Sequence, residues 1–505
     1  MSNLVFVPIV VLYFGVVGAL FIYGVNCFYL TYVAWRKRDT QSSPPPLAAW
    51  PRVTVQLPLY NELYVAERLI RTVAQLDYPA ALLEIQVLDD STDETVDVVR
   101  CAVERLRAQG VNIVHLHRAH RDGFKAGALA EGLARAHGEF VAIFDADFIP
   151  PPDFLKRTLP YFQDARLAFV QTRWGYVNRN YSLLTYLQSL MIDAHFVVEQ
   201  FARFHNGYWF NFNGTAGVWR RAALEDAGGW RADTLTEDLD VSYRAFLRGW
   251  RAAYVRDVEA PSELPASFSA YRRQQYRWAR GSLECARKFL PQVWRAPISF
   301  MQKVQATLHL TGYGIHLLMC LLAGLYPAML AVSLHYADWV RLFGLAVIFS
   351  MTTLAQLLFF AVSQRELGRR WWQGLPLILM NMAFGAGMML NTMRAALDIL
   401  RGRRSVFERT PKFGLAHRQQ GWVHRRYQLQ LDPMVFYELA FALFNFGTVV
   451  FAVWVSNWVI AGYALLFGAG LLFTSGLTLA QTFAVQRQRA RSATPPLPAQ
   501  ISAGD

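Results

Sequence analysis

Long stretches with few charged residues at both ends of the chain most strongly limit what it can fold into. Residues 4–33 are apolar and almost uncharged, and about 20 such residues suffice for a helix to cross a bilayer. The stretch is too long for the core of a signal peptide and has no basic start. A basic cluster, Arg36 to Arg38, follows it. By the positive-inside rule, this helix ends in the cytoplasm.

The membrane-like pattern returns after about residue 300. We predict further spans at 307–334, 340–362, 435–455 and 458–483. The apolar segment 375–397 is interrupted by Gly, Asn and Arg residues, and the strongly basic stretch 401–426 follows it. If 375–397 crossed fully, that basic stretch would lie outside, against the positive-inside rule. We therefore expect a re-entrant or interfacial segment there and five full spans in total.

The net charge of +13 could indicate a nucleic-acid partner. The basic residues, however, cluster beside apolar stretches (35–38, 401–404 and 487–491), as is typical of a cytoplasmic membrane face. We therefore expect no nucleic-acid partner. The four cysteines are scattered and lack zinc-site spacing, so neither a disulfide framework nor a zinc site is predicted.

The middle of the chain has the pattern of a water-soluble α/β domain. Apolar strand-like runs alternate with helical stretches, which indicates a parallel, doubly wound sheet; the runs are 53–57, 84–88, 112–116, 140–144 and 167–171. The predicted organisation is a transmembrane helix (1–34), a linker (35–51), the α/β domain (52–262), interfacial helices (263–305), transmembrane or interfacial helices (306–400), a basic loop (401–426), two spans (435–483) and a basic tail (484–505).

Two of these strands end in acidic residues. Asp145 and Asp147 follow the run 140–144, and Asp89 and Asp90 end the run 84–88. In open α/β sheets the carboxyl ends of strands bind ligands, and paired carboxylates suit Mg²⁺ or Mn²⁺ with a nucleotide diphosphate. Asp89 or Asp90 could accept hydrogen bonds from a nucleobase or ribose. The alternatives are a solvated turn and a helix start, where Asp is also common.

A series of motifs occurs in order along this region. They are QVLDDSTDET, GFKAGAL, FDADF, FNGTAGVWRRAALEDAGGW, TEDLDVSYRAFLRGW, SELP and QQYRW. Over residues 52–278 the chain resembles the processive family 2 glycosyltransferases: cellulose, chitin and hyaluronan synthases. It is most similar to the cellulose-synthase-like mannan and glucan synthases. The resemblance implies a GT-A-type α/β glycosyltransferase domain joined to an α-helical transmembrane domain.

The resemblance also implies roles for single residues. The last residue of the TED motif, Asp238, would be the catalytic base. The nucleotide sugar would be bound by Asp89, Asp90, Lys125, Asp145 and Asp147, with the metal ion on Asp147. The acceptor and diphosphate would meet Asn213, Glu237, Gln274, Arg277 and Trp278, and a gating loop would use Phe407, Thr410 and Lys412. Cellulose synthases have cysteine in place of Asn213, and Arg409 replaces the valine of their gating motif.

Each motif also has a plainer interpretation from its own residues. TEDLD is typical of an acidic helix start that Thr236 caps, and Lys125 could be a solvated surface lysine. Asn213 could belong to a buried polar loop. The segment around Gln274 to Trp278 could be an amphipathic interfacial helix, and 407–412 could be a basic linker.

We therefore expect an integral membrane protein of the plasma (inner) membrane with a cytoplasmic catalytic domain. It would use Mg²⁺ or Mn²⁺, a nucleotide-sugar donor (UDP-glucose or GDP-mannose), a growing polysaccharide acceptor and membrane lipid. Its product would be a β-1,4-linked glucan or mannan, formed with inversion and passed across the membrane. The alternatives are a single-sugar lipid glycosyltransferase of the ceramide-glucosyltransferase type and a nucleotide-gated membrane transporter. Partner subunits stay undetermined.

Overall fold

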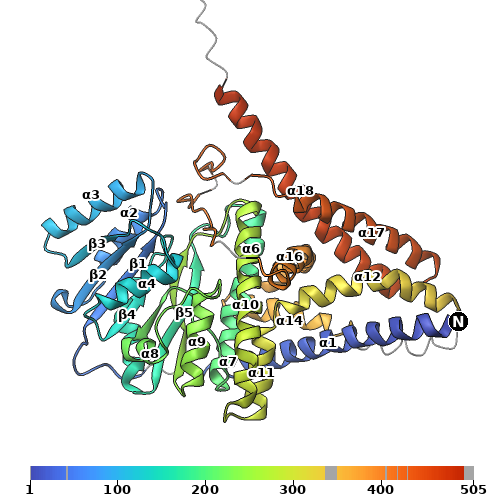
Figure 1. Cartoon of the computed structure of the whole chain (residues 1–505), viewed down its shortest axis with the longest axis horizontal. Helices are drawn as coiled ribbons and strands as arrows, with labels where there is room; N and C mark the ends of the chain where they lie inside the picture. Colours follow the sequence, from blue (N-terminus) through green and yellow to red (C-terminus); the bar gives the residue numbers. More distant parts are fainter. Residues whose placement is uncertain are drawn as a thin grey trace, which may run out of the picture.

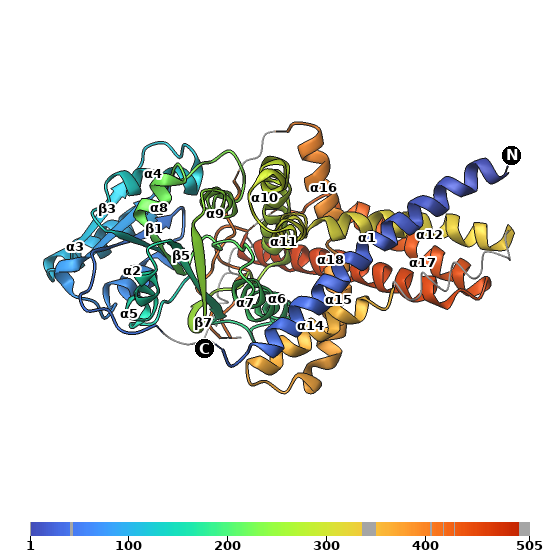
Figure 2. The same cartoon turned by 90° about the horizontal axis from the view of Figure 1, so that it is seen from below.

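The chain has a sheet-containing region and a region of long helices (Figure 1). The structure is a computed structural model and describes residues 2–40, 44–335, 350–403, 407–417, 419–428 and 430–493. The predicted span 340–362, the basic loop 401–426 and the basic tail 484–505 therefore lie partly outside the described residues. In both views α10 (Phe268–Arg295) lies between the sheet and the long helices (Figures 1 and 2).

The sheet has seven strands in the order β3-β2-β1-β4-β6-β5-β7. The strands are β1 (Val53–Leu59), β2 (Leu83–Asp89), β3 (Ile113–His117), β4 (Phe140–Ile143), β5 (Leu167–Tyr176), β6 (Gly217–Arg220) and β7 (Arg251–Ser262). The first five overlap the five predicted runs, which confirms them. The sheet is mixed rather than fully parallel, because β6 pairs antiparallel with both β4 and β5. The short β6 has no apolar run long enough to be recognised from sequence.

Helices cover both faces of this sheet and explain why its central strands are so apolar. On one face, Leu69 of α2 (Ala66–Ala74) and Val99 of α3 (Thr95–Ala108) belong to a core shared with β1 and β2. On the other face, Leu129 of α4 (Phe124–Ala134) and Val241 of α9 (Glu237–Leu247) pack with β4 to β6. Strands buried on both faces read as continuous apolar runs. The remaining helices here are η1 (Ala80–Leu82), α5 (Phe154–Thr158), η2 (Leu159–Gln163) and α8 (Arg221–Asp226).

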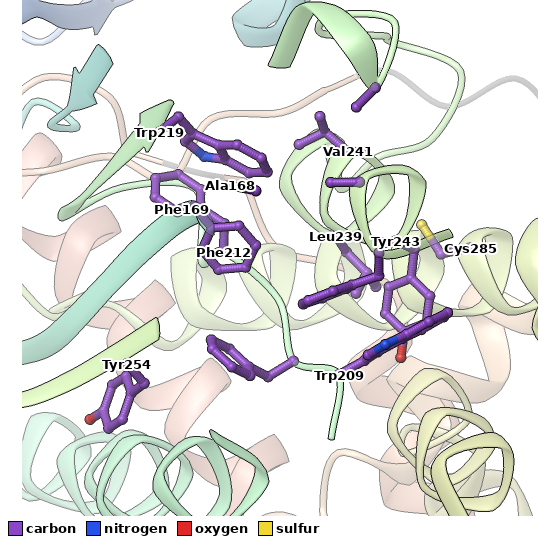
Figure 3. Close-up of a cluster of buried hydrophobic side chains, with 14 of the residues drawn as sticks. Ala168, Phe169, Trp209, Phe212, Trp219, Leu239, Val241, Tyr243, Tyr254 and Cys285 are labelled. Atoms are coloured by element: carbon purple, nitrogen blue, oxygen red, sulfur yellow. The ribbon is translucent and has the colours of Figure 1, made fainter. Parts of the chain in front are cut away.

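An aromatic core joins the sheet to the helices that carry the later motifs. Phe169 of β5 and Trp219 of β6 have ring centroids 4.6 Å apart, and Trp209 packs edge-on against Tyr243 of α9 at 5.6 Å. Cys285 of α10 lies in the same cluster (Figure 3). Large aromatic side chains bury much apolar area at each contact. This packing fixes α9 and α10 relative to the strand ends.

A single interrupted helix leads from the sheet toward the long helices. It consists of α6 (Leu183–Ala194), the π-helical turn η3 (His195–Gln200) and α7 (Phe201–His205). Ser182 begins α6 with a capping box in which its hydroxyl accepts from the Thr185 N–H. After α10, helix α11 (Phe300–Leu310) leads into the helical region.

The helical region consists of α1 (Ser2–Arg36), α12 (Gly314–His335), α14 (Thr353–Glu366), η5 (Trp371–Gly374), α15 (Leu375–Ala386), α16 (Met389–Leu400), α17 (Met434–Trp454) and α18 (Trp458–Ala493). In the described part of the chain, five helices are long and apolar enough to cross a membrane: residues 6–36, 314–335, 371–400, 434–454 and 458–488. Four of these overlap spans predicted from the sequence.

The fifth candidate, residues 371–400, contains the segment for which we expected a re-entrant or interfacial course. The structure divides it into α15 and α16, with the break at Gly387 and Met388. Figure 1 looks nearly along α16, whereas α1, α12 and α17 run across the view. Helix α16 thus runs across the direction of α1, α12 and α17, although length and composition alone would allow residues 371–400 to cross a membrane.

Candidate active site

The two aspartates after β4 line one cavity, and each is paired with a lysine. The Nζ of Lys125 lies 2.6 Å from Asp145 Oδ1. Asp147 Oδ2 accepts a hydrogen bond from Lys412 Nζ at 2.8 Å and from the Glu263 N–H at 3.0 Å. Because β4 stops at Ile143, both side chains project from the turn at the carboxyl end of a central strand.

Lys125 lies in the first turn of α4 and connects several acidic groups. Its ammonium is 3.6 Å from Glu237 Oε1 and donates to the Gly214 carbonyl at 2.9 Å. Burial alone would lower the pKa of Lys125, but the nearby charges of Asp145 and Glu237 outweigh it and the pKa is raised. Burial raises the pKa of Asp145, although Lys125 opposes this. The lysine is a mostly buried, ion-paired residue, with its side chain 15% exposed, and not the solvated surface residue of the plainer interpretation.

Asp238 lies in the first turn of α9 and also lines the cavity. Burial, followed by the neighbouring Glu237 carboxylate, raises its pKa to about 7. Gly214, with φ of +76°, brings its backbone so close that a Cβ there would lie 3.2 Å from Asp238 Oδ2. A carboxylate with a pKa near neutrality is well suited to accept a proton from a hydroxyl.

The prediction that the Thr236 side chain caps the start of α9 is wrong. Thr236 is the N-cap residue, but its side chain caps no backbone group. Its hydroxyl instead lies 3.6 Å from the sulfur of Cys285 on α10. The Thr236 side chain therefore contributes to the packing of α9 on α10 and, contrary to what the local motif predicts, does not cap the start of α9.

Three residues of the α10 motif face the same cavity: Gln274, Arg277 and Trp278. Arg277 Nη1 donates to the Glu408 carbonyl at 2.8 Å, and its guanidinium lies 4.4 Å from the centre of the Phe407 ring. The positive charge is thus held at the cavity by backbone and aromatic contacts, where it can meet an anionic group.

The segment 407–415 closes one side of the cavity. The Phe407 ring stacks on Phe124 with centroids 5.9 Å apart. The backbone N–H groups of Phe413 and Leu415 donate to the two carboxylate oxygens of Glu263, at 2.8 and 3.1 Å. Thr410 is buried and lines the cavity with Lys412. The segment is therefore docked on the α/β domain by specific contacts, unlike a free basic linker.

The two aspartates at the end of β2 face different surroundings. Asp90 lines the cavity and forms two hydrogen bonds with Arg118, at 2.7 and 2.6 Å. Asp89 is fully buried away from the cavity lining, where it accepts from the Ser91 N–H at 2.9 Å and lies 2.9 Å from His115 Nε2. With His117, Asp89 and His115 form a group whose ligand atoms lie within 4.8 Å of one another.

The structure thus brings nearly all of the predicted site residues to one cavity. The predicted residues that line it are Asp90, Lys125, Asp145, Asp147, Asn213, Glu237, Asp238, Gln274, Arg277, Trp278, Phe407, Thr410 and Lys412. Asp89 does not line it. Its hydrogen bonds hold the end of β2 in place beside Asp90.

Sequence reasoning gave no role to several charged residues that line the cavity. They include Glu62, Arg121, Glu263 and Arg409. Arg409 Nη1 lies 3.4 Å from Glu62 Oε1, and Arg121 lies over the Tyr60 ring at 3.5 Å. Glu263 belongs to the SELP motif, which was a signal for it. Glu62 and Arg409 are far apart in sequence, and no local pattern shows that they meet.

The residues present fit a divalent cation. Asp145 and Asp147 place carboxylate oxygens at one wall of the cavity, and such hard oxygen donors are the ligands that Mg²⁺ and Mn²⁺ prefer. Each carboxylate is already paired with a positive charge in the structure, Asp145 with the ammonium of Lys125 and Asp147 with that of Lys412.

Comparison with known proteins identifies the class of this domain. Residues 51–281 match the model of the family described as "Glycosyltransferase like family 2". This match over residues 51–281 confirms the resemblance to the family 2 glycosyltransferases that the motifs indicated.

The curated proteins similar to this chain include two glucomannan 4-beta-mannosyltransferases. The chain is 43% identical over 289 residues to glucomannan 4-beta-mannosyltransferase 2 of Arabidopsis thaliana, an alignment covering 54% of each chain. It is 46% identical over 253 residues to glucomannan 4-beta-mannosyltransferase 1 of Oryza sativa subsp. japonica, covering 49% of each chain. The alignments thus span about half the length of these relatives.

Among solved structures, a mannosyltransferase from Pyrobaculum calidifontis in complex with GDP-Man and Mn²⁺ resembles the chain with a TM-score of 0.52. It is 22% identical and covers 77% of this chain and 99% of its own. At this identity the likeness supports the fold, a GT-A-like mixed sheet, and nothing finer.

Proposed function

We propose that this chain is a membrane-embedded, inverting β-glycan synthase. It would transfer a hexose from a nucleotide sugar, GDP-mannose or UDP-glucose, to the end of a β-1,4-linked mannan or glucan. The observation that carries the proposal is one cavity in which Asp238, Asp147 and Arg277 meet. These residues supply a base, a carboxylate for a cation and a fixed positive charge. The family 2 domain and the mannosyltransferase relatives support the reaction class.

Asp238 is proposed to act as the general base. Its pKa of about 7 makes it a stronger base than an ordinary aspartate, yet one still ionised in a large fraction of molecules at neutral pH. The acceptor hydroxyl would give its proton to the Asp238 carboxylate while its oxygen bonds to C1 of the donor sugar. The bond from C1 to the diphosphate oxygen breaks on the opposite face, so the anomeric centre is inverted.

Two cationic side chains, Lys125 and Arg277, would stabilise the negative charge on the leaving diphosphate. Lys125 lies between Asp145 and Glu237, and Arg277 lines the same cavity, where it interacts electrostatically with Glu237, Asp145 and Asp238. Fixed charges that need no reorganisation during the reaction stabilise such a developing charge best. A divalent cation held by Asp147, with Asp145 beside it, would supply further neutralisation of the diphosphate.

The segment 407–412 is proposed to cover the bound donor. The Phe407 ring stacks on Phe124, and the guanidinium of Arg277 lies over the Phe407 ring. Lys412 donates a hydrogen bond to Asp147. Closing such a segment excludes water and reduces wasteful hydrolysis of the donor. The five candidate spans would place the cavity at the cytoplasmic face of the plasma (inner) membrane. They would also offer a route for the product past Trp278.

The test is a direct assay of the purified protein with a panel of nucleotide sugars in Mg²⁺ or Mn²⁺, with linkage and chain-length analysis of the product. We expect a polymer of β-1,4-linked mannose or glucose and release of the nucleoside diphosphate. A product with one sugar on a lipid would instead support the ceramide-glucosyltransferase alternative. Nucleotide binding without sugar transfer from any donor would contradict the proposal.

A further inference from the structure

The π-helical turn η3, His195–Gln200, is an unusual feature close to the cavity. Turns of this kind are rare, occur mostly as single turns inside α-helices and are frequent at functional sites. Ile192, one turn before His195, lines the cavity. Residues three apart share a helix face, so His195 lies on the same side of the helix as Ile192 and is linked to the cavity through Asn213, which lines it.

A ladder of polar contacts runs along η3 and fixes the His195 ring. His195 Nδ1 lies 3.0 Å from Glu199 Oε2, and the other oxygen of Glu199 accepts from Arg203 Nε at 3.0 Å. Arg203 is buried, and its Nη1 donates to the Gln305 carbonyl of α11 at 3.1 Å. Burial favours the neutral form of Glu199, but Arg203 and the His195 contact outweigh it and lower the pKa of this carboxyl. The ladder therefore holds a charged acceptor against the histidine.

The other nitrogen of His195 meets Asn213. His195 Nε2 lies 3.2 Å from Asn213 Oδ1. Asn211 Nδ2 also donates to this oxygen, at 3.1 Å, and to the Phe212 carbonyl at 3.0 Å. These two contacts assign the amide orientation, so the oxygen of Asn213 is the acceptor that faces His195 Nε2. The ring donates to Glu199 and to Asn213 together when both of its nitrogens carry a proton. Asn213 Nδ2 faces the Asn211 carbonyl at 3.3 Å, which occupies one of its two N–H groups.

Asn213 lies beside the proposed base. It lines the cavity together with Asp238, and the next residue, Gly214, has its backbone near Asp238 Oδ2. The side chains of His195 and Glu199 are 30% and 26% exposed, so the ladder borders open space rather than the closed core.

We propose that the Glu199–His195 pair is a positioning device that fixes the Asn213 amide as a ligand of the acceptor sugar. Glu199 orients the imidazole, the imidazole holds the amide oxygen, and the amide nitrogen is thereby aimed at a hydroxyl of the incoming chain end. This inference rests on the proposed glycan synthase function. It deepens that function by adding His195 and Glu199, which no sequence motif identified, to the acceptor role that the resemblance implied for Asn213. Donor binding, in contrast, lies on the wall formed by Asp90, Lys125 and Asp147.

The test separates acceptor use from donor use. His195→Ala, His195→Gln and Glu199→Gln would be assayed with β-1,4-mannohexaose and cellohexaose as acceptors and GDP-mannose and UDP-glucose as donors. Donor affinity and donor hydrolysis in the absence of acceptor would be measured in parallel. We expect His195→Ala to raise the KM for the oligosaccharide or lower kcat/KM about 10- to 100-fold, as for a displaced positioning group. Donor affinity and hydrolysis should stay within about 2-fold, since neither depends on Asn213.

Glu199→Gln and His195→Gln should reduce acceptor use less than His195→Ala does. Glu199→Gln keeps an oxygen that can accept from His195 and should lose less. His195→Gln keeps a donor of similar reach and should recover part of the acceptor affinity if His195→Ala folds poorly. His137→Ala is the matched control, because His137 pairs with Glu84 at 3.1 Å on an exposed surface outside the cavity lining.

Two results would overturn the inference. One is unchanged oligosaccharide kinetics in both His195 variants while the wild-type protein transfers sugar. The other is an equal loss of donor affinity and acceptor use together with a lower melting temperature, which would mean a structural role. A wild-type protein that transfers sugar to no oligosaccharide would contradict the proposed function itself, and the two failures are thus distinguishable.

Discussion

Two groups of charged residues lie on the walls of the same cavity, and they differ in where their positive charge comes from. The Asp238 cluster consists of Lys125, Asp145, Glu237 and Asp238, all within residues 51–281, the domain that matches the family 2 model. The Asp147 cluster consists of Glu62, Asp147 and Glu263 with two cations, Arg409 and Lys412, that come from the segment after α16. The first cluster is complete within the domain. In the second, Arg68 of the domain acts on Glu263, but the cations paired with Asp147 and Glu62 come from a distant segment of the chain.

This difference predicts that the two clusters serve different steps: the Asp147 cluster binds the donor and the Asp238 cluster transfers the proton. Lys125 stays with Asp238 whatever the segment 407–412 does, so the proposed base keeps its electrostatic surroundings. If the segment moved away, Asp147 would lose Lys412 and Glu62 would lose Arg409. Uncompensated carboxylates in a partly buried site bind a cation strongly or take up protons. Donor binding should therefore depend on the segment, and proton transfer should not.

Replacing Asp238 with Asn should have the largest effect on transfer. The amide keeps the shape but cannot accept a proton, so the rate should fall by roughly the 10²- to 10⁴-fold typical of a lost general base. Donor affinity should be almost unchanged, because the Asp147 cluster is intact. Sugar transfer and titration of donor binding would be measured on the same preparation. Equal losses in both would mean that Asp238 belongs to donor binding.

Replacing residues 407–412 with a Gly/Ser linker of equal length should come next. Removal of Phe407, Arg409 and Lys412 opens one side of the cavity, so transfer should slow by about 10²-fold through loss of positioning and water exclusion. The fold should persist, because the strands and helices of the domain lie elsewhere. The measurement is the ratio of transfer to donor hydrolysis. An unchanged ratio and rate would reduce the segment to a linker.

Asp147→Asn should weaken metal-dependent donor binding about 10-fold or more, since it removes a charged oxygen ligand. Asp145→Asn should lie between Asp147→Asn and Asp238→Asn in its balance of binding and transfer losses, because Asp145 contacts Lys125 and not Lys412. Donor affinity with and without Mn²⁺ checks both. The same affinity for wild type and Asp147→Asn across Mn²⁺ concentrations would contradict the assignment of the cation to Asp147.

Glu62→Gln should have the smallest effect on transfer. Burial raises the pKa of Glu62 from 4.5 to about 8, with Arg409 opposing the shift and Asp147 adding to it. The carboxyl is therefore mostly neutral at pH 7, as the amide is. Because the folded pKa is the higher one, ionisation costs stability progressively as the pH rises from 4.5 through 8.

The variant should therefore melt at a higher temperature than wild type at pH 8, with the difference shrinking toward pH 5. Thermal unfolding at several pH values measures this. A Glu62→Gln protein that is less stable at pH 8 than at pH 5, relative to wild type, would show that the Glu62–Arg409 ion pair outweighs the burial.

The parts of the fold that the sequence predicted are those buried on both faces. The runs in β1, β2 and β4 were clear because helices cover them on either side. Strand β7 was missed because it lies at the edge of the sheet and mixes charged with apolar residues, so it has no continuous apolar run. The short antiparallel β6 is set by its neighbours on both sides rather than by its own residues.

The candidate site divides in the same way. Asp145, Asp147 and Asp238 could be predicted because each follows a strand or begins a helix within a recognisable motif. Contacts between distant segments could not, and these include Glu62 with Arg409 and Glu263 with the backbone of Phe413. His195 and Glu199 are spaced four apart, as many helical pairs are. Only the fold shows that this pair meets Asn213.

The pH dependence of sugar transfer at saturating donor tests the role of Asp238 most directly. Burial and Glu237 raise the pKa of this carboxyl to about 7. The base is therefore protonated and inactive below that pH and ionised above it. We expect the wild-type rate to fall close to tenfold per pH unit well below pH 7, and the residual rate of Asp238→Asn to lack this limb. A wild-type rate that stays constant from pH 8 down to pH 5 would contradict the assignment of Asp238 as the base.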